Sequence, residues 1–185
     1  MIGIDEVGRG SWAGPLLVVA VRLTGDLPLG VSDSKVLSKK KRELLFHDIK
    51  LVCTIGAGWV EPIEIDMLGL TQAMYLAVER ALNAVAAKPN EEIIIDGNIN
   101  YCSHIFTNSK AVINADASHS IVSAASVYAK VLRDNYICEQ AKLNPAYSFE
   151  KHVGYVTLKT NLALKQQGIC ILQQKEFNAN KPVVH

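Results

Sequence analysis

The sequence predicts an α/β fold in which a mixed central β-sheet is flanked by helices. Short runs rich in β-branched and aliphatic residues alternate with longer stretches whose apolar residues recur at helical spacing. The first strand-like runs follow one another as in a hairpin, whereas later runs are separated by helical patterns, which favours both antiparallel and parallel pairing. The 185 residues, of which 49% are hydrophobic, suffice for one compact domain and exclude an intrinsically disordered chain.

The front of the chain contains predicted strands and one helix. The strands are expected at Met1–Asp5, Leu16–Leu23 and Leu51–Val60, and the helix at Ser38–Lys50. Because glycine weakens a strand interior, Gly56 and Gly58 predict a bulge in the third strand.

The rest of the chain alternates helices and short strands. In order, we expect a helix at Pro62–Ala87, a strand at Ile93–Ile95, a weaker strand at Ala111–Ile113, a long helix ending near Leu143 and a last helix at Tyr155–Gln167. Residues 1–185 are therefore interpreted as a single domain with a short C-terminal helical segment over about 145–185.

Charge and cysteine content exclude several classes of protein. Lys and Arg number 19 against 18 Asp and Glu, so the net charge of +1 excludes a uniformly basic coat for nucleic acid, though not a local basic groove. The cysteines form no C-x-x-C or Cys/His pair, which gives a zinc site no support and predicts free thiols in a reducing compartment. With neither a signal-peptide pattern nor an apolar run long enough to span a bilayer, we expect a cytoplasmic protein without a membrane partner.

Acidic residues follow three of the predicted strands. Asp5 and Glu6 end the first strand, Asp96 follows the isoleucine run, and Asp116 comes shortly after the weaker strand. Ligands of α/β folds bind at the carboxyl ends of strands, and carboxylates gathered there repel one another unless a cation neutralises them. Hard oxygen ligands suit Mg²⁺ or Mn²⁺, and two such ions can activate water and stabilise the leaving oxygen of a phosphodiester.

A structural interpretation of these acids stays open. A single aspartate after a strand, particularly one followed by glycine as at Asp96-Gly97, is commonly a turn or helix-cap residue. Asp134 is a further acid, on the same face of the long helix as Ser126 and Lys130. Its four-residue spacing from Lys130 predicts an ion pair with that lysine rather than metal ligation.

Three segments carry groups suited to a nucleic-acid backbone. Gly8-Arg9-Gly10 combines an accessible backbone with a guanidinium group, although a tight turn is the alternative. The run from Lys35 to Arg42 places five basic residues in eight positions at a predicted helix start, which is either a phosphate-binding end or a solvated face. Tyr155 either anchors the core or stacks on a sugar or base.

Five motifs occur in a fixed order: G-I-D-E-V-G-R-G at 3–10, D-S-K-V-L-S at 33–38, I-I-D-G-N at 94–98, S-A-A-S-V-Y-A-K-V-L-R-D at 123–134 and G-Y-V-T at 154–157. Each motif alone is a weak signal, but the ordered set covers nearly the whole chain. It resembles the bacterial type 2 ribonuclease H family, ribonuclease HII. The resemblance implies an RNase H-like fold and hydrolysis of RNA in RNA/DNA hybrids. It also implies cleavage on the 5′ side of a single ribonucleotide in duplex DNA, which leaves 3′-hydroxyl and 5′-phosphate ends and serves ribonucleotide removal.

The resemblance also assigns roles to residues. The catalytic acids that hold two Mg²⁺ or Mn²⁺ ions would be Asp5, Glu6, Asp96 and Asp116, because the family's fourth acid precedes the S-A-A-S helix and so favours Asp116 over Asp134. The substrate-binding residues would be Gly8, Arg9 and Gly10 at the phosphate and 2′-hydroxyl of the ribonucleotide, Tyr155 on the next deoxyribose, and Lys35, Ser126 and Lys130 in support.

The chain departs from the family pattern at several basic or rigid positions. Ser11 replaces the usual proline after G-R-G, Val153 a lysine, and Thr160 a histidine, while Ser118 stands near the place of a basic residue. A basic C-terminal segment is replaced by Leu172-Gln173-Gln174-Lys175. These changes spare the acids but remove phosphate contacts, so they bear on affinity and salt tolerance more than on chemistry.

Two other functions compete with a metal-dependent endoribonuclease that acts as a monomer. A hybrid-binding module on the same fold would bind without cutting, but it would gain nothing from a repulsive carboxylate cluster. A small-molecule α/β enzyme is the other alternative, but the sequence contains no G-x-G-x-x-G or G-x-x-x-x-G-K-[ST] loop that would bind a nucleotide. Whether a replication clamp contacts the C-terminal tail is left open.

The net charge conceals an uneven distribution. Residues 1–34 carry −2, 35–42 carry +5, 43–150 carry −6 and 151–185 carry +4. Two basic segments are thus set against an acidic body that contains the proposed metal site, which indicates where a nucleic-acid groove should lie.

Overall fold

The computed structural model describes residues 1–31, 36–155, 157 and 172. Its centre is a five-stranded sheet with the strand order β3-β2-β1-β4-β5. The strands are β1 (Ile2–Val7), β2 (Leu16–Leu23), β3 (Cys53–Val60), β4 (Ile93–Asp96) and β5 (Ser109–Val112). β1, β2 and β3 pair antiparallel, whereas β1, β4 and β5 pair parallel. The predicted mixed α/β sheet is therefore confirmed.

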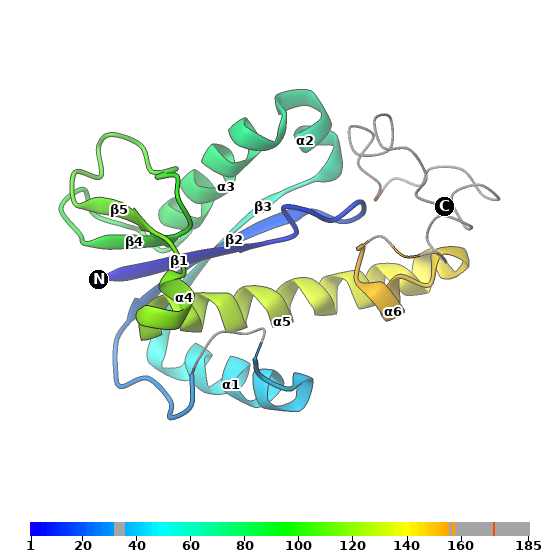
Figure 1. Cartoon of the computed structure of the whole chain (residues 1–185), viewed down its shortest axis with the longest axis horizontal. Coiled ribbons are helices and arrows are strands. Elements are labelled where there is room, and N and C mark those ends of the chain that lie inside the picture. Colours follow the sequence, from blue (N-terminus) through cyan, green and yellow to red (C-terminus); the bar gives the residue numbers. More distant parts are fainter. Residues whose placement is uncertain (32–35, 156, 158–171, 173–185) are drawn as a thin grey trace.

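Helices cover both faces of this sheet (Figure 1). They are α1 (Lys39–Val52), α2 (Pro62–Leu68), α3 (Leu70–Ala84), α4 (Ala115–Ser118), α5 (Ser120–Leu143) and α6 (Phe149–His152), with a 3₁₀ turn at Pro145–Tyr147. Alternate residues of β2 supply the two cores: Leu16, Val18 and Ala20 pack with α3, while Leu17, Val19 and Val21 pack with α1 and α5. The continuous apolar run of β2 follows from this burial on both faces.

The predicted bulge in the third strand is wrong. β3 pairs with β2 without interruption from Leu16 opposite Val60 to Leu23 opposite Cys53. A Cβ atom on Gly56 would collide with the carbonyl oxygen of Ala81, and one on Gly58 with that of Ala77. The two glycines therefore serve the close approach of α3 to the sheet rather than an extra residue in the strand.

The predicted helix over Pro62–Ala87 is two helices. Gly69, with φ 74°, ends α2 by donating its N–H to the carbonyl of Ile65 at 2.9 Å, and it is also the N-cap residue of α3. Glycine adopts this positive φ without steric cost, and the turn interrupts the helical hydrogen bonds between α2 and α3. The apolar pattern continues across Gly69 because α2 and α3 bury residues in the same hydrophobic core. The pattern alone therefore could not reveal the break.

Asp116 does not follow directly from a strand. β5 begins two residues earlier than predicted and ends at Val112, after which Asn114 takes a left-handed conformation with φ 55°. Asp116 thus lies in the first turn of the short helix α4. The long helix that follows ends at Leu143, as predicted.

The predicted C-terminal helical segment is described only in part. The 3₁₀ turn and α6 place Tyr147 and Phe149 against Ile137 and Ala141 of α5. The predicted helix Tyr155–Gln167 lies almost wholly outside the described residues. Among the helices that the structure describes, none combines the length and apolar character needed to cross a lipid bilayer.

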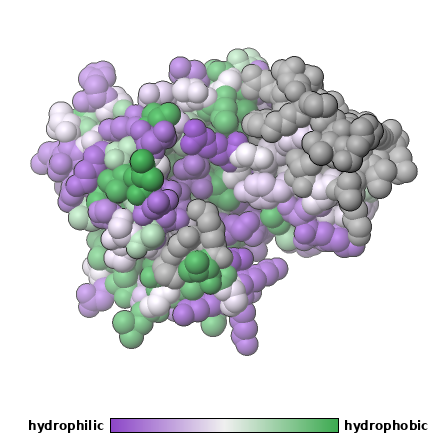
Figure 2. All heavy atoms as spheres, viewed as in Figure 1, coloured by the Kyte–Doolittle hydropathy of each residue, from purple (hydrophilic) through white to green (hydrophobic). Residues whose placement is uncertain are grey.

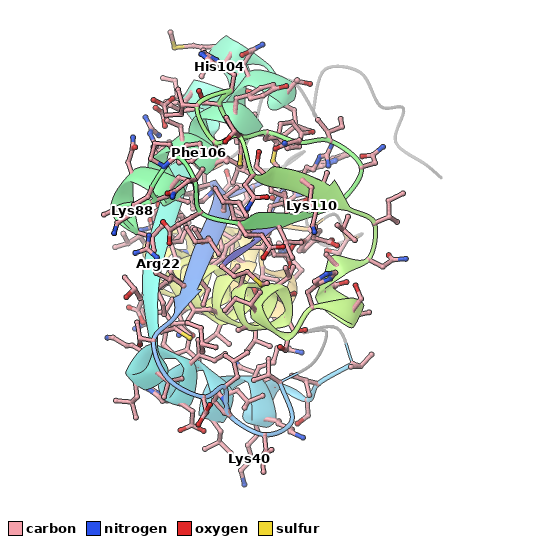
Figure 3. All side chains as sticks on the ribbon, turned by 90° about the vertical axis from the view of Figure 1, so that its left-hand side faces the viewer. Arg22, Lys40, Lys88, His104, Phe106 and Lys110 are labelled. Atoms are coloured by element: carbon pink, nitrogen blue, oxygen red, sulfur yellow. The ribbon has the colours of Figure 1, made fainter. Side chains whose placement is uncertain are left out.

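Polar and apolar side chains are interspersed over the face shown in Figure 2. The view from the side shows α1 as the outermost layer, with the exposed Lys40 projecting from it (Figure 3). Near the end of β2, Arg22 donates to both oxygens of Glu91, at 2.7 and 2.6 Å, and to the carbonyls of Val85 and Ala86. The basic α1 layer and this ion pair therefore occupy different parts of the surface.

Candidate metal and nucleic-acid site

A cavity of about 370 Å³ opens where β1 leads into the Gly8–Gly10 turn. Its wall includes nine residues predicted from the sequence: Asp5, Glu6, Gly8, Arg9, Gly10, Asp96, Ser126, Lys130 and Tyr155. The structure therefore brings together motifs that span most of the described chain. Asp116 does not line this cavity, and Lys35 lies outside the described residues.

The acids reach the cavity because of strand pairing. The parallel register places Ile4 opposite Ile95, so Asp5 and Asp96, one residue further along, emerge side by side at the carboxyl ends of β1 and β4. Glu6 follows on the same strand and is half-buried. We call Asp5, Glu6 and Asp96 the acidic wall.

Burial and like charges perturb the acidic wall. Asp5 is only 7% exposed. Its burial, and then the neighbouring charges of Glu6 and Asp96, raise its pKa to about 8, although hydrogen bonds from the Ser126 side chain and the Glu6 N–H oppose the rise. Burial and Asp96 also raise the pKa of Glu6, against the opposing charge of Arg9. Both groups thus lie where a cation would relieve an unfavourable charge.

Asp96 has a structural role and also lies in the cavity, where its metal ligation stays a prediction. Its Oδ1 accepts a hydrogen bond of 2.6 Å from the backbone N–H of Ala115, at the start of α4, so it caps that helix. It also lines the cavity beside Asp5. Asp116 is adjacent to the capped residue and only 4% exposed, and its carbonyl accepts a bond of 2.6 Å from the Ser123 hydroxyl.

The donor set of the acidic wall fits a hard divalent cation. Carboxylate oxygens are the ligands that Mg²⁺ and Mn²⁺ prefer. Burial and the neighbouring acids raise the pKa of Asp5 and Glu6, so a bound cation would favour their charged forms. Within residues 1–31, 36–155, 157 and 172, no three acidic, imidazole or thiol groups already stand close enough to form a ready-made ion site.

The rest of the cavity lining includes basic and aromatic side chains. We call Gly8–Gly10 and Tyr155 the loop wall. Arg9 forms a 3.7 Å ion pair with Glu6 and donates from Nη2 to the hydroxyl of Tyr101 at 3.2 Å. Lys130 pairs with Asp134 at 2.9 Å, as its spacing predicted, and its Nζ lies 5.7 Å from the centre of the Tyr155 ring. Tyr155 is 38% exposed, so it is not a core anchor.

Sequence reasoning missed three residues around this site. Arg42 lines the cavity, and its place in the basic run was the signal for it. Tyr101 is only 4% exposed and holds Arg9, but nothing in the sequence connects the two residues. Arg133, which the motif carried only as a basic neighbour of Asp134, is fully buried behind the loop wall.

The fold and the site define the class of protein first. A mixed sheet with helices on both faces, whose central parallel strands carry carboxylates into a cavity rimmed by basic groups, is the RNase H-like arrangement. Solved structures share it. The chain is similar to ribonuclease H2 of Pyrococcus horikoshii, with a TM-score of 0.75 and 27% identity over 95% of this chain and 92% of that one. A structure described as the PCNA:RNase HII complex of Archaeoglobus fulgidus matches with a TM-score of 0.81 and 24% identity, over 99% and 97% of the two chains.

Sequence comparison narrows the class to one family. The model of the family Ribonuclease HII matches residues 2–179. The chain is 41% identical to Ribonuclease HII of Shewanella pealeana, over 95% of this chain and 86% of the relative, and 38% identical to that of Psychromonas ingrahamii, over 98% and 89%. The chain belongs to the ribonuclease HII family, and its enzyme class is that of a ribonuclease H endonuclease.

Proposed function

We propose that this chain nicks duplex DNA on the 5′ side of a single embedded ribonucleotide and also cuts the RNA strand of RNA/DNA hybrids. One observation supports this best: a single cavity is lined by three carboxylates and also by two arginines, a lysine and an exposed tyrosine. The carboxylates suit cations, whereas the basic and aromatic groups suit a phosphate backbone and a sugar or base.

The residues divide the work of substrate recognition. The backbone of Gly8 and Gly10 and the guanidinium of Arg9 hold the scissile phosphate and the 2′-hydroxyl of the ribonucleotide. Tyr155 stacks on the deoxyribose that follows, and Lys130 and Ser126 support the backbone. Lys35 would add a contact from the basic segment, as would Arg42, which lines the cavity.

Asp5, Glu6 and Asp96 would hold the catalytic cations, with Asp116 joining from α4. Two divalent ions, Mg²⁺ or Mn²⁺, would activate the attacking water and stabilise the leaving oxygen. In the hydrolysis, an oxygen–phosphorus bond forms to water and the bond to the upstream 3′ oxygen breaks. The 3′ oxygen takes up a proton, and the phosphate stays on the 5′ side of the ribonucleotide. The structure titled as Bst-RNase HIII in complex with Mn²⁺ matches this fold with a TM-score of 0.68.

The cellular setting belongs to the same proposal. The chain would act as a monomer in the cytoplasm on ribonucleotides left in DNA, and the free thiols Cys53, Cys102 and Cys138 suit a reducing compartment. The Archaeoglobus fulgidus structure is of a complex with PCNA. Residues 173–185 lie outside the described part of this chain, and the question of a clamp contact of the C-terminal tail stays open.

The test uses a DNA duplex that carries one ribonucleotide and a fluorescent label at each end of that strand. We expect one nick 5′ of the ribonucleotide, an upstream product that a polymerase extends from its 3′-hydroxyl, and a downstream product that a phosphatase alters. A nick on the 3′ side, or a cyclic phosphate end, would contradict the proposal. Tight binding of the duplex without any nick would favour the hybrid-binding module instead.

A further inference from the structure

A fully buried arginine lies behind the loop wall. Arg133 of α5 has no exposed surface, and its guanidinium makes four hydrogen bonds. It donates to the carbonyl oxygens of Pro15 at 2.9 Å, Ala13 at 3.0 Å and Val153 at 3.0 Å, and to the hydroxyl of Ser11 at 2.7 Å. All four acceptors are neutral, so the positive charge is satisfied by dipoles.

These acceptors come from the two segments that carry the loop wall. Ser11, Ala13 and Pro15 directly follow the Gly8–Gly10 turn, whereas Val153 lies two residues before Tyr155. The segments also bond to each other, since the N–H groups of Trp12 and Ala13 donate to the carbonyl of Gly154 at 3.0 and 3.1 Å. Arg133 therefore joins two parts of the site that are far apart in the sequence.

Ser11 connects the guanidinium to the turn itself. Its hydroxyl accepts from Arg133 and donates to the carbonyl of Gly8 at 2.9 Å. The proline that usually stands at this position in the resembled family has no hydroxyl, so it could not form this bridge. Gly8 has φ 93°, and a Cβ atom there would press on Nε of Arg133, so the turn packs directly on the guanidinium.

Tyr155 also lies within reach of the same group. The Arg133 guanidinium carbon is 5.9 Å from the centre of the Tyr155 ring, at the limit of a cation–π contact. The neighbouring carboxylate on the helix, Asp134, is paired with Lys130 at 2.9 Å. The Tyr155 ring thus lies near two cationic groups, those of Lys130 and Arg133.

We propose that Ser11 and Arg133 are positioning residues that fix the separation between the Gly8–Gly10 turn and Tyr155, and that this separation sets the preference for a single ribonucleotide followed by deoxyribose. The inference rests on the proposed function, because it assumes that the turn binds the ribonucleotide and Tyr155 the next sugar. A long hybrid offers many equivalent registers, whereas a single ribonucleotide offers one. Removing the hydrogen bonds of Ser11 or Arg133 should therefore lower cleavage at a single ribonucleotide more than cleavage of a long hybrid.

The primary variant is Ser11→Ala, which removes the bridging hydroxyl without adding volume. The matched control is Ser109→Ala. The Ser109 hydroxyl likewise donates to a carbonyl three residues earlier, that of Phe106 at 2.8 Å, and accepts from a side chain, that of Asn100 at 2.9 Å. The melting temperatures of both variants show whether either substitution destabilises the fold.

The readout is kcat/KM on a duplex with one ribonucleotide and on a long RNA/DNA hybrid. For Ser11→Ala we expect about a 10-fold loss on the single site and less than about 3-fold on the hybrid, the size that one or two hydrogen bonds supply. Ser109→Ala should leave both values unchanged. Equal losses on both substrates would overturn the positioning role.

A double-mutant cycle with Tyr155→Ala adds an independent test. If Ser11 acts by placing Tyr155, then Ser11→Ala should lower the single-site rate little further once the ring is gone. Losses that multiply would contradict the coupling. Wild-type protein that nicks neither substrate would instead sink the proposed function, so the two failures are distinguishable.

Binding supplies a readout that does not need cleavage. In an Asp5→Asn background, the affinity ratio between the ribonucleotide duplex and an all-DNA duplex, measured by fluorescence anisotropy, should fall on adding Ser11→Ala. Arg133→Lys should lower this ratio further, because a single ammonium group cannot reach all the separate acceptors that the planar guanidinium of Arg133 reaches. An unchanged ratio in both variants would also overturn the inference.

Discussion

The acidic wall of the cavity stands on paired strands, whereas the loop wall stands on a turn and a loop segment held from behind. Asp5 and Asp96 are placed by a parallel register between neighbouring strands. The Gly8–Gly10 turn and Tyr155 depend on the long-range contacts of Arg133, which reach Ser11 across 122 residues of sequence. The acidic wall also concentrates like charge, while the loop wall concentrates hydrogen bonds to neutral oxygens. The acidic wall therefore depends on strand pairing and gathers unfavourable like charge, whereas the loop wall depends on hydrogen bonds from the side chain of a distant helix.

The largest effect is expected on the acidic wall. Asp5→Asn should lower the nicking rate by ~100- to 1000-fold, because the amide is a neutral and weaker ligand for cations that contribute several kcal/mol to the transition state. The matched control is Asp26→Asn, which removes an exposed acid away from the cavity. Single-turnover rates on the ribonucleotide duplex measure the difference. Equal rates for the two variants would show that Asp5 is not a ligand.

Asp5→Asn should also change how the stability of the fold depends on pH. Without metal, the pKa of Asp5 is about 8 in the folded state against 3.8 for an ordinary aspartate. Between these values the folded state keeps a proton that the unfolded state releases, so stability falls as the pH rises and levels off above about 8. Thermal melts in chelator should show this decline for the wild type and a flatter profile, with a higher melting temperature near pH 8, for Asp5→Asn. A steeper decline in the variant would contradict the charge assignment.

On the loop wall, Tyr155→Ala should reduce cutting at a single ribonucleotide by ~10-fold and affect long hybrids less. The loss corresponds to a stacking contact of about 1–3 kcal/mol. Tyr155→Phe keeps the ring and should retain most of the rate, which makes it the control. Comparable losses on the two substrates would mean that Tyr155 does not sense the junction.

The smallest effect is expected at Tyr101, which contacts Arg9 but does not line the cavity. Tyr101→Phe removes the hydroxyl that accepts from Arg9 and leaves the ring in place. We expect KM for the duplex to rise by about 2- to 5-fold with kcat little changed, since water can replace the lost acceptor of the partly exposed Arg9 and the net loss is then about 1 kcal/mol or less. Tyr136→Phe, on a half-buried ring beside Trp59, is the control. A fall in kcat alone would place Tyr101 in the chemistry rather than in the binding of Arg9.

The sequence predicted what depends on local pattern. Strand-like runs gave β1, β2 and β4 nearly to the residue, and the acids that follow β1 and β4 do line one cavity. Periodicity could not detect the break at Gly69, because both helices bury the same face, and it misjudged Gly56 and Gly58, whose reason lies in a helix packed against them.

The loop wall shows the other limit of sequence reasoning. The motifs named Gly8, Arg9, Gly10 and Tyr155, but not the residues that hold them. Arg133 looked like one more basic group beside Asp134, and its burial follows only from the packing of α5 on the segment after β1. The roles of all the predicted site residues stay predictions, as does the single-domain assignment, and Asp116 and Lys35 are not among the residues that line the cavity.

The most direct test of the metal-dependent site is nicking of a one-ribonucleotide duplex through a cycle of chelation and metal return, beside an identical all-DNA duplex. Nicking should occur with Mg²⁺ or Mn²⁺, stop on chelation, resume when the ion is restored, and never touch the all-DNA strand. Nicking that persists in chelator, or stable binding without nicking at any metal concentration, would contradict the assignment of the acidic wall.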